Sequence, residues 1–193
     1  MKVLIASHNP AKVNDYKKGL EKEGIEVVSL SDLNIQDKFE ETKKTFKANA
    51  IGKAKYYYNL TKIPTLSEDS GLEIEVLNNE PGVLSRRWPG YEASDEELVE
   101  YLKSKLPLLK NNNKAQFKAC LALIKDNKVF TVENSIKGYI SNNLNLNFPK
   151  GFPYRAFFKI NGYNKYFMDL TEEEYNKENH RQKNINDILK YLK

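Results

Sequence analysis

The chain has 193 residues, of which 40% are hydrophobic and 30% are charged, and its formal net charge is +5. This length suffices for one large domain or two small lobes with a real hydrophobic core. No apolar run approaches the roughly 18 residues of a membrane span, and the apolar start at 1–6 lacks the cleavage pattern of a signal peptide. The single cysteine, Cys120, excludes a disulfide framework and a cysteine-rich metal site. We expect a cytoplasmic protein with no membrane association.

The excess of positive charge can attract any polyanion. Most of the lysines are scattered over presumed helix faces, which is the pattern of an ordinary solvated surface. Nucleic-acid-binding proteins tend instead to concentrate basic residues and to interleave them with aromatic residues, and only the C-terminal third hints at that. No nucleic-acid partner is therefore expected, and salt-dependent binding of oligonucleotides would argue against this interpretation.

The first functional pattern is a polar turn between an apolar strand and a helix. Residues 2–6 form the strand, Ser7-His8-Asn9-Pro10-Ala11-Lys12 forms the turn, and apolar residues at spacings of three and four follow. Asn9 suits the N-cap and Pro10 the first helical position. Free backbone N–H groups at a helix N-terminus bind anions, and Lys12 lies within reach of the same anion. The segment fits an anion site and an ordinary capped helix about equally well, and it lacks the P-loop pattern.

The central pattern is Ser67-Glu68-Asp69-Ser70-Gly71-Leu72, which follows a short apolar run and leads into a strand at 72–77. We place its two carboxylates where a strand ends. Carboxylate oxygens are the usual ligands of Mg²⁺, and a carboxylate in this position can orient or deprotonate a water molecule. An acidic turn between two strands is the simpler alternative, because Asp, Ser and Gly are ordinary turn residues. Taken alone, the hexapeptide favours the turn.

A polar connection leads into the second helix, which is expected from about residue 45 to residue 60. Glu40 and Glu41 precede this helix, so they are free to turn toward a site, although solvated loop charge is the simpler explanation. Asn49 and Lys53 lie one turn apart on a face of the helix other than its apolar stripe. On these residues alone, neither carboxylate is assigned a role.

The rest of the chain is expected to alternate between short strands and helices. Periodicity, capping signals and turn residues predict strands at 25–30, 115–124, 128–137 and 165–167, a hairpin at Asp126-Asn127, a helix from Ser94 to about Leu106, and a final helix from Thr171 that carries His180 and Arg181. His180 has polar neighbours in the sequence, so a core histidine is less expected here than usual. A solvated pair is the alternative to a functional one.

Aromatic residues gather in the segment Gly151-Phe152-Pro153-Tyr154-Arg155-Ala156-Phe157-Phe158. Simple core packing would explain them. The glycine and the proline at the start of the segment favour instead an exposed loop that presents a ring for stacking on a nucleobase.

These motifs occur in one recognisable order along the chain. They are Ser7-His8-Asn9-Pro10-Ala11-Lys12, Glu40-Glu41-Thr42, Glu68-Asp69-Ser70-Gly71-Leu72, Pro81-Gly82-Val83-x-Ser85-x-Arg87, Gly151-Phe152 and His180-Arg181. Over essentially its whole length the chain resembles the inosine triphosphate pyrophosphatase family, the XTP/dITP diphosphatases. The resemblance implies an α/β fold in which one domain, residues 1–193, has two lobes that share a long mixed β-sheet flanked by helices, around a central nucleotide-binding cleft. It also implies a homodimer.

The resemblance further implies Mg²⁺-dependent hydrolysis of non-standard purine nucleoside triphosphates (ITP, dITP or XTP) to the monophosphate and pyrophosphate. Asp69 is implied as the general base and, together with Glu41 and Glu68, as a metal ligand. The turn after the first strand and Lys53 are implied to bind the triphosphate, while Phe152 stacks on the base. The implied substrate contacts are Ser7, His8, Asn9, Lys12, Lys53, Ser70, Phe152, Tyr154, Arg155, His180 and Arg181.

The implied reaction agrees with the chemistry of the residues. Attack of water on the α-phosphorus needs charge neutralisation, positioning and a base, and lysines, Mg²⁺ and one carboxylate supply them. Two alternatives stay open. One is a nucleotide-binding or regulatory protein that has lost turnover, against which the retention of Asp69 and Glu41 argues. The other is a diphosphatase of the same chemistry for a pyrimidine or modified base.

Three positions depart from the family pattern. Arg155 stands where the family usually has an acidic residue, Tyr175 where it has a lysine, and Asn179 where it has a serine. All three lie in the part that reads or holds the nucleotide. Because an arginine side chain can only donate hydrogen bonds, we hypothesise that Arg155 faces the 6-oxo group of inosine or xanthosine.

Overall fold

The computed structural model describes residues 1–193 and separates into two compact units. Unit 1 contains Met1–Asp69, Ala119–Asn134 and His180–Lys193, and unit 2 contains Ser70–Lys118 and Ser135–Asn179. Three long strands contribute residues to both units. The expected single domain with two lobes stays a prediction.

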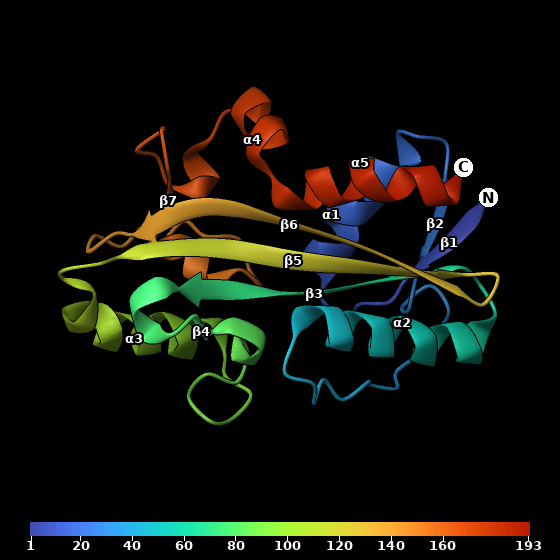
Figure 1. Ribbon diagram of the computed structural model, residues 1–193, viewed down its shortest axis with the longest axis horizontal. Helices are drawn as coiled ribbons and strands as arrows, with labels where there is room; N and C mark the ends of the chain where they lie inside the picture. The colour runs from blue at the N-terminus through green and yellow to red at the C-terminus, as the bar shows by residue number, and fades with distance from the viewer. The chain divides into compact units, whose positions relative to one another are not determined.

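The protein is a mixed α/β structure (Figure 1). Its strands are β1 (Lys2–Ile5), β2 (Glu26–Ser29), β3 (Thr65–Ile74), β4 (Glu80–Pro81), β5 (Lys114–Lys125), β6 (Lys128–Ile140) and β7 (Phe158–Ile160), and its α-helices are α1 (Pro10–Glu21), α2 (Phe46–Thr61), α3 (Asp95–Lys105), α4 (Glu172–Glu178) and α5 (His180–Leu192). The strands follow the order β2-β1-β3-β5-β6-β7, and β4 pairs with β3. β1 runs parallel to β2 and β3, whereas β4 and β7 pair antiparallel with β3 and β6. The predicted α/β class with a mixed sheet flanked by helices is confirmed.

In unit 1, the two faces of β1 pack against different helices. Successive side chains of a strand point to opposite faces. Val3 and Ile5 belong to a buried cluster with residues of α1 and α5, whereas Leu4 and Ala6 pack with Tyr57 of α2. Figure 1 accordingly shows α1 and α5 together on one side of these strands and α2 on the other. The apolar faces of α1, α2 and α5 thus pack against the strands of unit 1 and hold the helices to the sheet.

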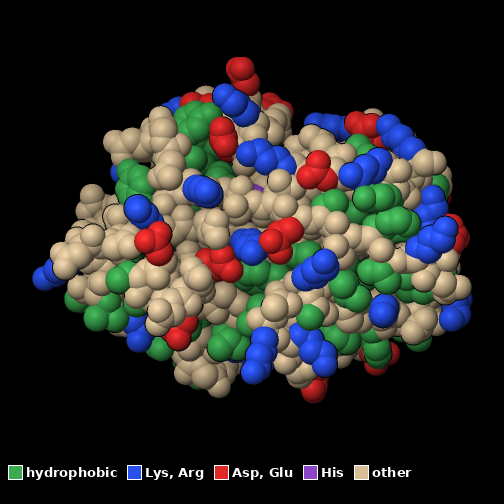
Figure 2. Space-filling view, in the orientation of Figure 1, with side chains coloured by type: hydrophobic (Ala, Val, Ile, Leu, Met, Phe, Trp, Pro, Cys, Tyr) green, Lys and Arg blue, Asp and Glu red, His purple; other side chains and the backbone are tan.

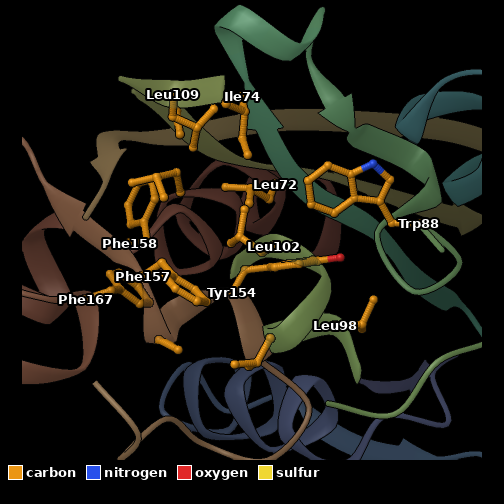
Figure 3. Close-up of a cluster of buried hydrophobic side chains, with 14 of the residues drawn as sticks. Leu72, Ile74, Trp88, Leu98, Leu102, Leu109, Tyr154, Phe157, Phe158 and Phe167 are labelled. Atoms are coloured by element: carbon orange, nitrogen blue, oxygen red, sulfur yellow. The ribbon is translucent and has the colours of Figure 1, made fainter. Parts of the chain in front are cut away.

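Unit 2 is built around an aromatic-rich core. Figure 3 shows Trp88, Tyr154, Phe157, Phe158 and Phe167 gathered with aliphatic side chains of β3 and α3. The rings of Trp88 and Tyr154 meet edge to face, with 6.0 Å between their centroids, which is a favourable arrangement for aromatic pairs. Helix α3 begins at the predicted capping box and packs its leucines into this core.

The hexapeptide at 67–72 is neither a turn nor the end of a strand. β3 runs without interruption from Thr65 to Ile74, and most of its residues are buried. Both expectations for this segment are therefore wrong. Residues that often form turns stay extended here because the buried carboxylates are paired with polar and cationic side chains, which removes the penalty of burying them unpaired.

Two further predictions for the second half of the chain are wrong. The final helix is divided, because α4 ends at Glu178 and Asn179 adopts an extended ψ of 113° before α5 begins at His180. This break separates a helix of unit 2 from a helix of unit 1. The segment expected as the last strand, 165–167, forms only an isolated bridge, and its phenylalanine is drawn into the core of unit 2.

The long hairpin is confirmed. Strands β5 and β6 are joined at Asp126 and Asn127, whose φ angles are 51° and 60°. Two consecutive positive φ angles match the primed two-residue turn that the strand twist favours, and Asp and Asn tolerate this conformation. The turn chemistry therefore predicted this connection correctly.

The surface carries both signs of charge. On the face shown in Figure 2, the Lys and Arg side chains are interspersed with Asp and Glu and form no continuous basic stripe. None of the helices combines the length and the hydrophobicity needed to cross a membrane.

Candidate active site

The turn between β1 and α1 is organised by its own side chains. Asn9 Oδ1 accepts hydrogen bonds from the backbone N–H groups of Ala11 (2.9 Å) and Lys12 (3.3 Å), and Asn9 N–H donates to Ser7 Oγ at 3.1 Å. The predicted N-cap is confirmed, with Pro10 at the start of the helix. The turn thus holds the N-terminal end of α1 in a fixed orientation, with a lysine in its first turn.

His8 makes a separate contact. Its Nε2 lies 2.9 Å from the carbonyl oxygen of Asp37, and the Tyr57 hydroxyl donates to the same oxygen at 2.6 Å. The His8 side chain therefore joins the turn to the connection that follows β2.

β3 presents its two adjacent acidic side chains, those of Glu68 and Asp69, to opposite faces. Glu68 contacts Tyr16 of α1 and Arg181 of α5, whereas Asp69 contacts Asn49 of α2. Adjacent residues of a strand must diverge in this way. Only 3% of Glu68 and 4% of Asp69 are exposed. The two carboxylates are neighbours in the sequence but have different surroundings.

Glu68 is held by four donors. Arg181 binds it through two hydrogen bonds, Nε to Oε2 at 2.8 Å and Nη2 to Oε1 at 3.0 Å. The Tyr16 hydroxyl donates to Oε2 at 2.5 Å, and Lys12 Nζ lies 3.1 Å from Oε1. Fork-to-fork pairs of this kind are among the strongest charged hydrogen bonds. The buried charge of Glu68 is therefore compensated by cations that the sequence assigned to substrate binding.

The charge of Glu68 raises the pKa values of its two buried donors, Tyr16 and Arg181. Burial raises the pKa of Tyr16 well above its ordinary value, and the charge of Glu68 raises it further, so the hydroxyl stays protonated as a donor. Burial alone would lower the pKa of Arg181, but the charge and hydrogen bonds of Glu68 raise it above its ordinary value. Arg181 also lies 3.6 Å from Asp15 Oδ2.

Asp69 has the properties of a proton acceptor near neutral pH. Burial raises its pKa from 3.8 to about 6, and the charge of Glu41 acts in the same direction. Lys12 and Lys53 oppose this rise, as does the hydrogen bond of 2.9 Å that Asn49 Nδ2 donates to Asp69 Oδ2. A carboxylate tuned toward neutral pH by burial and like charge is a common feature of general bases.

Asn49 connects Asp69 to the segment that carries Glu41. Its Nδ2 also donates to the carbonyl oxygen of Lys43 at 3.2 Å, and its Oδ1 accepts from Lys43 N–H at 2.8 Å. Glu41 forms an ion pair with Lys53, and Lys53 Nζ donates to the main-chain oxygen of Glu68 at 2.9 Å. Residues from three separate segments thus converge on one end of α2.

The carboxylates differ in how well they suit a metal ion. No group of three or more His, Cys, Asp or Glu side chains is arranged to hold one. Both oxygens of Glu68 already accept two donors each, so this side chain does not fit the predicted role of ligand. Glu41 and Asp69 do fit, because Glu41 lies close enough to Asp69 for its charge to raise the pKa of Asp69, and Mg²⁺ is commonly bound by one or two carboxylates together with substrate phosphates.

The residues expected in a base-binding loop lie in unit 2, and most are buried. Tyr154 packs in the core, and its hydroxyl donates to the main-chain oxygen of Ser85 at 2.6 Å. Only 6% of Arg155 is exposed, and its guanidinium lies 4.1 Å from the ring centroid of Phe152 and 4.2 Å from that of Phe167. The expectation of an exposed loop is wrong from residue 153 onward, because these apolar side chains complete the core. Phe152 alone is half-buried among the four aromatics of the segment.

His180 and Arg181 are buried at the start of α5, contrary to the expectation for a polar-flanked pair. The reason is the ion pair with Glu68, which makes burial of the arginine favourable. Ser70 is half-buried in β3. Among the three departures from the family pattern, Asn179 is buried, and the ring of Tyr175 lies 5.3 Å from that of Phe167.

Sequence reasoning missed two polar partners of the carboxylates. Tyr16 is one of the residues at spacings of three and four in the first helix, where the sequence pattern predicts only apolar packing, and the pattern gives Asn49 no role beside Lys53. Two features of the sequence could have pointed to these residues. Tyr16 brings a hydroxyl into an apolar stripe, and Asn49 brings a side-chain amide to the position one helical turn before Lys53.

The fold and this cluster define a class of protein, an α/β protein in which one buried carboxylate with a raised pKa lies near two lysines and the adjacent buried carboxylate is paired with an arginine. A family model described as the Ham1 family matches residues 3–191, and the chain belongs to this family. The dITP/XTP pyrophosphatase of Bacillus subtilis is 35% identical, with 98% of this chain and 96% of that protein covered. The protein of the same name from Aliarcobacter butzleri is also 35% identical, with coverage of 100% and 98%.

Solved structures of similar proteins also belong to the Ham1 family. The Ham1 protein of Staphylococcus aureus has a TM-score of 0.83 and 30% identity, with 100% of this chain and 98% of that chain covered. A HAM1 protein from Coxiella burnetii has a TM-score of 0.85 and 26% identity at the same coverage. The predicted family is confirmed, and so is its enzyme class, a nucleoside triphosphate pyrophosphatase.

Proposed function

We propose that this protein hydrolyses non-standard purine nucleoside triphosphates, ITP, dITP or XTP, to the monophosphate and pyrophosphate with the help of Mg²⁺. The observation that carries the proposal is Asp69, a buried carboxylate that accepts a hydrogen bond from Asn49, lies within electrostatic range of Lys12 and Lys53, and has a pKa raised to about 6. Such a group is unprotonated at neutral pH yet basic enough to take a proton from water. The names of the relatives, dITP/XTP pyrophosphatase, support the choice of substrate class.

In this proposal the triphosphate is bound by the N-terminal turn of α1 and by lysines. Ser7 and Asn9 shape the turn, and because the N–H groups of Ala11 and Lys12 already donate to Asn9 Oδ1, the positive end of the α1 dipole attracts the anion through charge. Lys12 and Lys53 neutralise the phosphate charge, which is the main requirement for reaction at phosphorus. The exposed location of His8 suits it to the edge of this phosphate site.

Asp69 accepts a proton from the attacking water as the oxygen approaches the α-phosphorus. Asn49 orients the carboxylate of Asp69 through its hydrogen bond of 2.9 Å to Oδ2. Glu41 and Asp69 would hold the metal, which when bound supplies further charge neutralisation on the phosphates and orients the water.

For the base, the half-buried Phe152 is the proposed stacking partner. Arg155 supports that ring from one face, since its guanidinium lies 4.1 Å from the ring centroid. This arrangement does not favour the hypothesis that Arg155 donates directly to the 6-oxo group of the base. His180 and Arg181 are proposed for base recognition, Ser70 for a further substrate contact, and Tyr154 for support of the loop.

The test is incubation of the protein with Mg²⁺ and a panel of ITP, dITP, XTP, dUTP, ATP and GTP, with chromatographic identification of the products. We expect monophosphate and pyrophosphate from the inosine and xanthosine nucleotides, and loss of both products in Asp69→Asn. Release of single phosphates would show that the scissile bond is wrong. Binding without turnover would favour a nucleotide-binding or regulatory protein, and a preference for dUTP would favour a pyrimidine substrate.

We also propose that the protein acts in the cytoplasm as a homodimer. The motifs that resemble the inosine triphosphate pyrophosphatase family are the reason to propose a dimer, and the lack of a signal-peptide pattern is the reason to propose the cytoplasm. Light scattering coupled to size-exclusion chromatography measures the mass directly, and a mass near that of one 22.4 kDa chain would contradict the dimer.

A further inference from the structure

We propose that Glu68 is a positioning residue for the cations that bind the nucleotide, that it is not a metal ligand, and that the Tyr16 hydroxyl holds it in place. This inference rests on the proposed function, because it concerns residues assigned there to the triphosphate and the base. It adds Tyr16 to the functional set and moves Glu68 out of the metal site.

Three cations meet at this one residue. Arg181 and Lys12 bind the carboxylate of Glu68, and Lys53 donates to its main-chain oxygen at 2.9 Å. Lys12 and Lys53 are the proposed phosphate-binding lysines, whereas Arg181 is proposed to recognise the base. A single buried anion thus sets the positions of groups that serve opposite ends of the nucleotide.

The contacts of Glu68 leave no oxygen available for a metal ion. Oε1 is shared by Arg181 Nη2 and Lys12 Nζ, and Oε2 by Arg181 Nε and the Tyr16 hydroxyl. Mg²⁺ demands near-ideal octahedral geometry at short distances, so it would have to displace one of these donors. Displacement of Arg181 would deprive a buried guanidinium of the carboxylate that binds it through two hydrogen bonds, which is strongly unfavourable.

The Tyr16 hydroxyl supplies a neutral donor in a place where a third full charge would be costly. Only 1% of Tyr16 is exposed, and its ring packs in the apolar cluster between β1, α1 and α5. The hydroxyl donates to Glu68 Oε2 at 2.5 Å. This hydrogen bond fixes the orientation of the Glu68 carboxylate. Because the hydroxyl is neutral, it does not cancel the negative charge of Glu68, and that charge can still attract Arg181 and Lys12.

The experiment uses the full-length protein and three variants, Glu68→Gln, Tyr16→Phe and, as a matched control at a proposed metal ligand, Glu41→Gln. Calorimetric titration in EDTA measures the affinities for ITP and for inorganic tripolyphosphate, and a separate titration measures Mn²⁺ affinity. The ratio of the two anion affinities isolates the contribution of the nucleoside, because both ligands carry a triphosphate. A purely structural role would not change this ratio.

We expect Glu68→Gln to reduce the ratio of ITP affinity to tripolyphosphate affinity by about tenfold, since Arg181 loses a charged bidentate partner. Tyr16→Phe, which removes only the hydroxyl, should change the ratio in the same direction by about threefold. Both variants should bind Mn²⁺ with wild-type affinity, whereas Glu41→Gln should bind it more weakly.

Two results would overturn the inference while leaving the proposed function intact. One is a loss of Mn²⁺ affinity in Glu68→Gln as large as in Glu41→Gln, which would make Glu68 a ligand. The other is an unchanged affinity ratio in both variants. If Glu68→Gln does not fold, Tyr16→Phe carries the test, because it keeps the ring and the charges. A wild-type protein that neither binds nor hydrolyses any nucleoside triphosphate would instead refute the proposed function, and this inference with it.

Discussion

Replacement of Asp69 by asparagine should stabilise the protein while abolishing its activity. Asp69 is buried, and its pKa is raised from 3.8 to about 6, chiefly by burial and then by the charge of Glu41. Its ionised form is therefore unfavourable in the folded protein at neutral pH. Asparagine has nearly the same shape, keeps an oxygen to accept the hydrogen bond from Asn49, and carries no charge.

The size of the expected stabilisation follows from the rise in the pKa of Asp69. A rise of about two pKa units corresponds to about 3 kcal/mol of unfavourable folding free energy once the group is fully ionised. Between about pH 4 and pH 6 the folded protein binds more protons than the unfolded chain, so the wild-type free energy of unfolding falls as the pH rises through this window. The advantage of Asp69→Asn should therefore be close to zero below the unfolded pKa, about half of its full value near pH 5, and about 3 kcal/mol above about pH 6.

Urea unfolding in EDTA at several pH values between about 5 and 7.5 measures these free energies by linear extrapolation. Asp126→Asn, at an exposed turn position with a positive φ that Asn tolerates equally well, is the control and should show no comparable gain. Added Mg²⁺ should stabilise the wild type more than Asp69→Asn, because a ligand that binds only the folded state raises its stability. A variant that is less stable than the wild type at neutral pH, or a difference that does not change with pH, would refute this account of Asp69.

The remaining predictions concern a ligand, a cap, a strand contact and the base loop. Glu41→Gln should raise the Mg²⁺ concentration needed for half-maximal turnover by at least about tenfold, and an unchanged metal requirement would remove Glu41 from the site. Asn9→Ala removes the cap of α1 and should lower the unfolding free energy by about 1 kcal/mol, measured by urea unfolding, with KM for the triphosphate raised as well; a stability loss without a KM effect would make the cap structural only. Gly138→Ala should destabilise by at least about 1–3 kcal/mol, because a Cβ at this position would lie 2.1 Å from the main-chain oxygen of Lys159, and wild-type thermal stability would contradict that contact. Arg155→Ala removes the support behind the stacking ring and should raise KM for ITP and XTP by about 2- to 10-fold with little change in kcat, whereas an altered ratio of ITP to ATP turnover would revive direct recognition of the base by Arg155.

The sequence predicted what depends on neighbours along the chain. The cap at Asn9, the capping box that starts α3 and the hairpin at Asp126-Asn127 were all found from local patterns. These features are stabilised by interactions between residues two to four positions apart, so their signals lie within a short stretch of sequence. The family and its ordered motifs were also visible in the sequence, because the order of motifs does not depend on where their side chains point.

The segment around Asp69 shows where local patterns fail. Its residues are ordinary turn residues, yet they form the middle of a ten-residue strand. The deciding interactions come from far along the chain, since Arg181 lies 113 residues from Glu68 and Asn49 lies 20 residues from Asp69. The six residues of this segment therefore cannot show that both carboxylates are buried with polar partners.

Local sequence patterns were thus enough to predict α1, α2, α3, the hairpin and the family, and to name the ionisable residues from which a site can be built. The surroundings of each of these ionisable residues depend on tertiary contacts. Because side chains alternate along β3, Glu68 and Asp69 lie on opposite faces of the strand. Glu68 contacts an arginine and a tyrosine, whereas Asp69 contacts an asparagine. The burial of Arg155 between two rings was decided in the same way, by packing partners that the local sequence does not contain. The free energy of a buried charge depends on these distant partners, and for this reason two adjacent carboxylates can differ in pKa and in the roles that we propose for them.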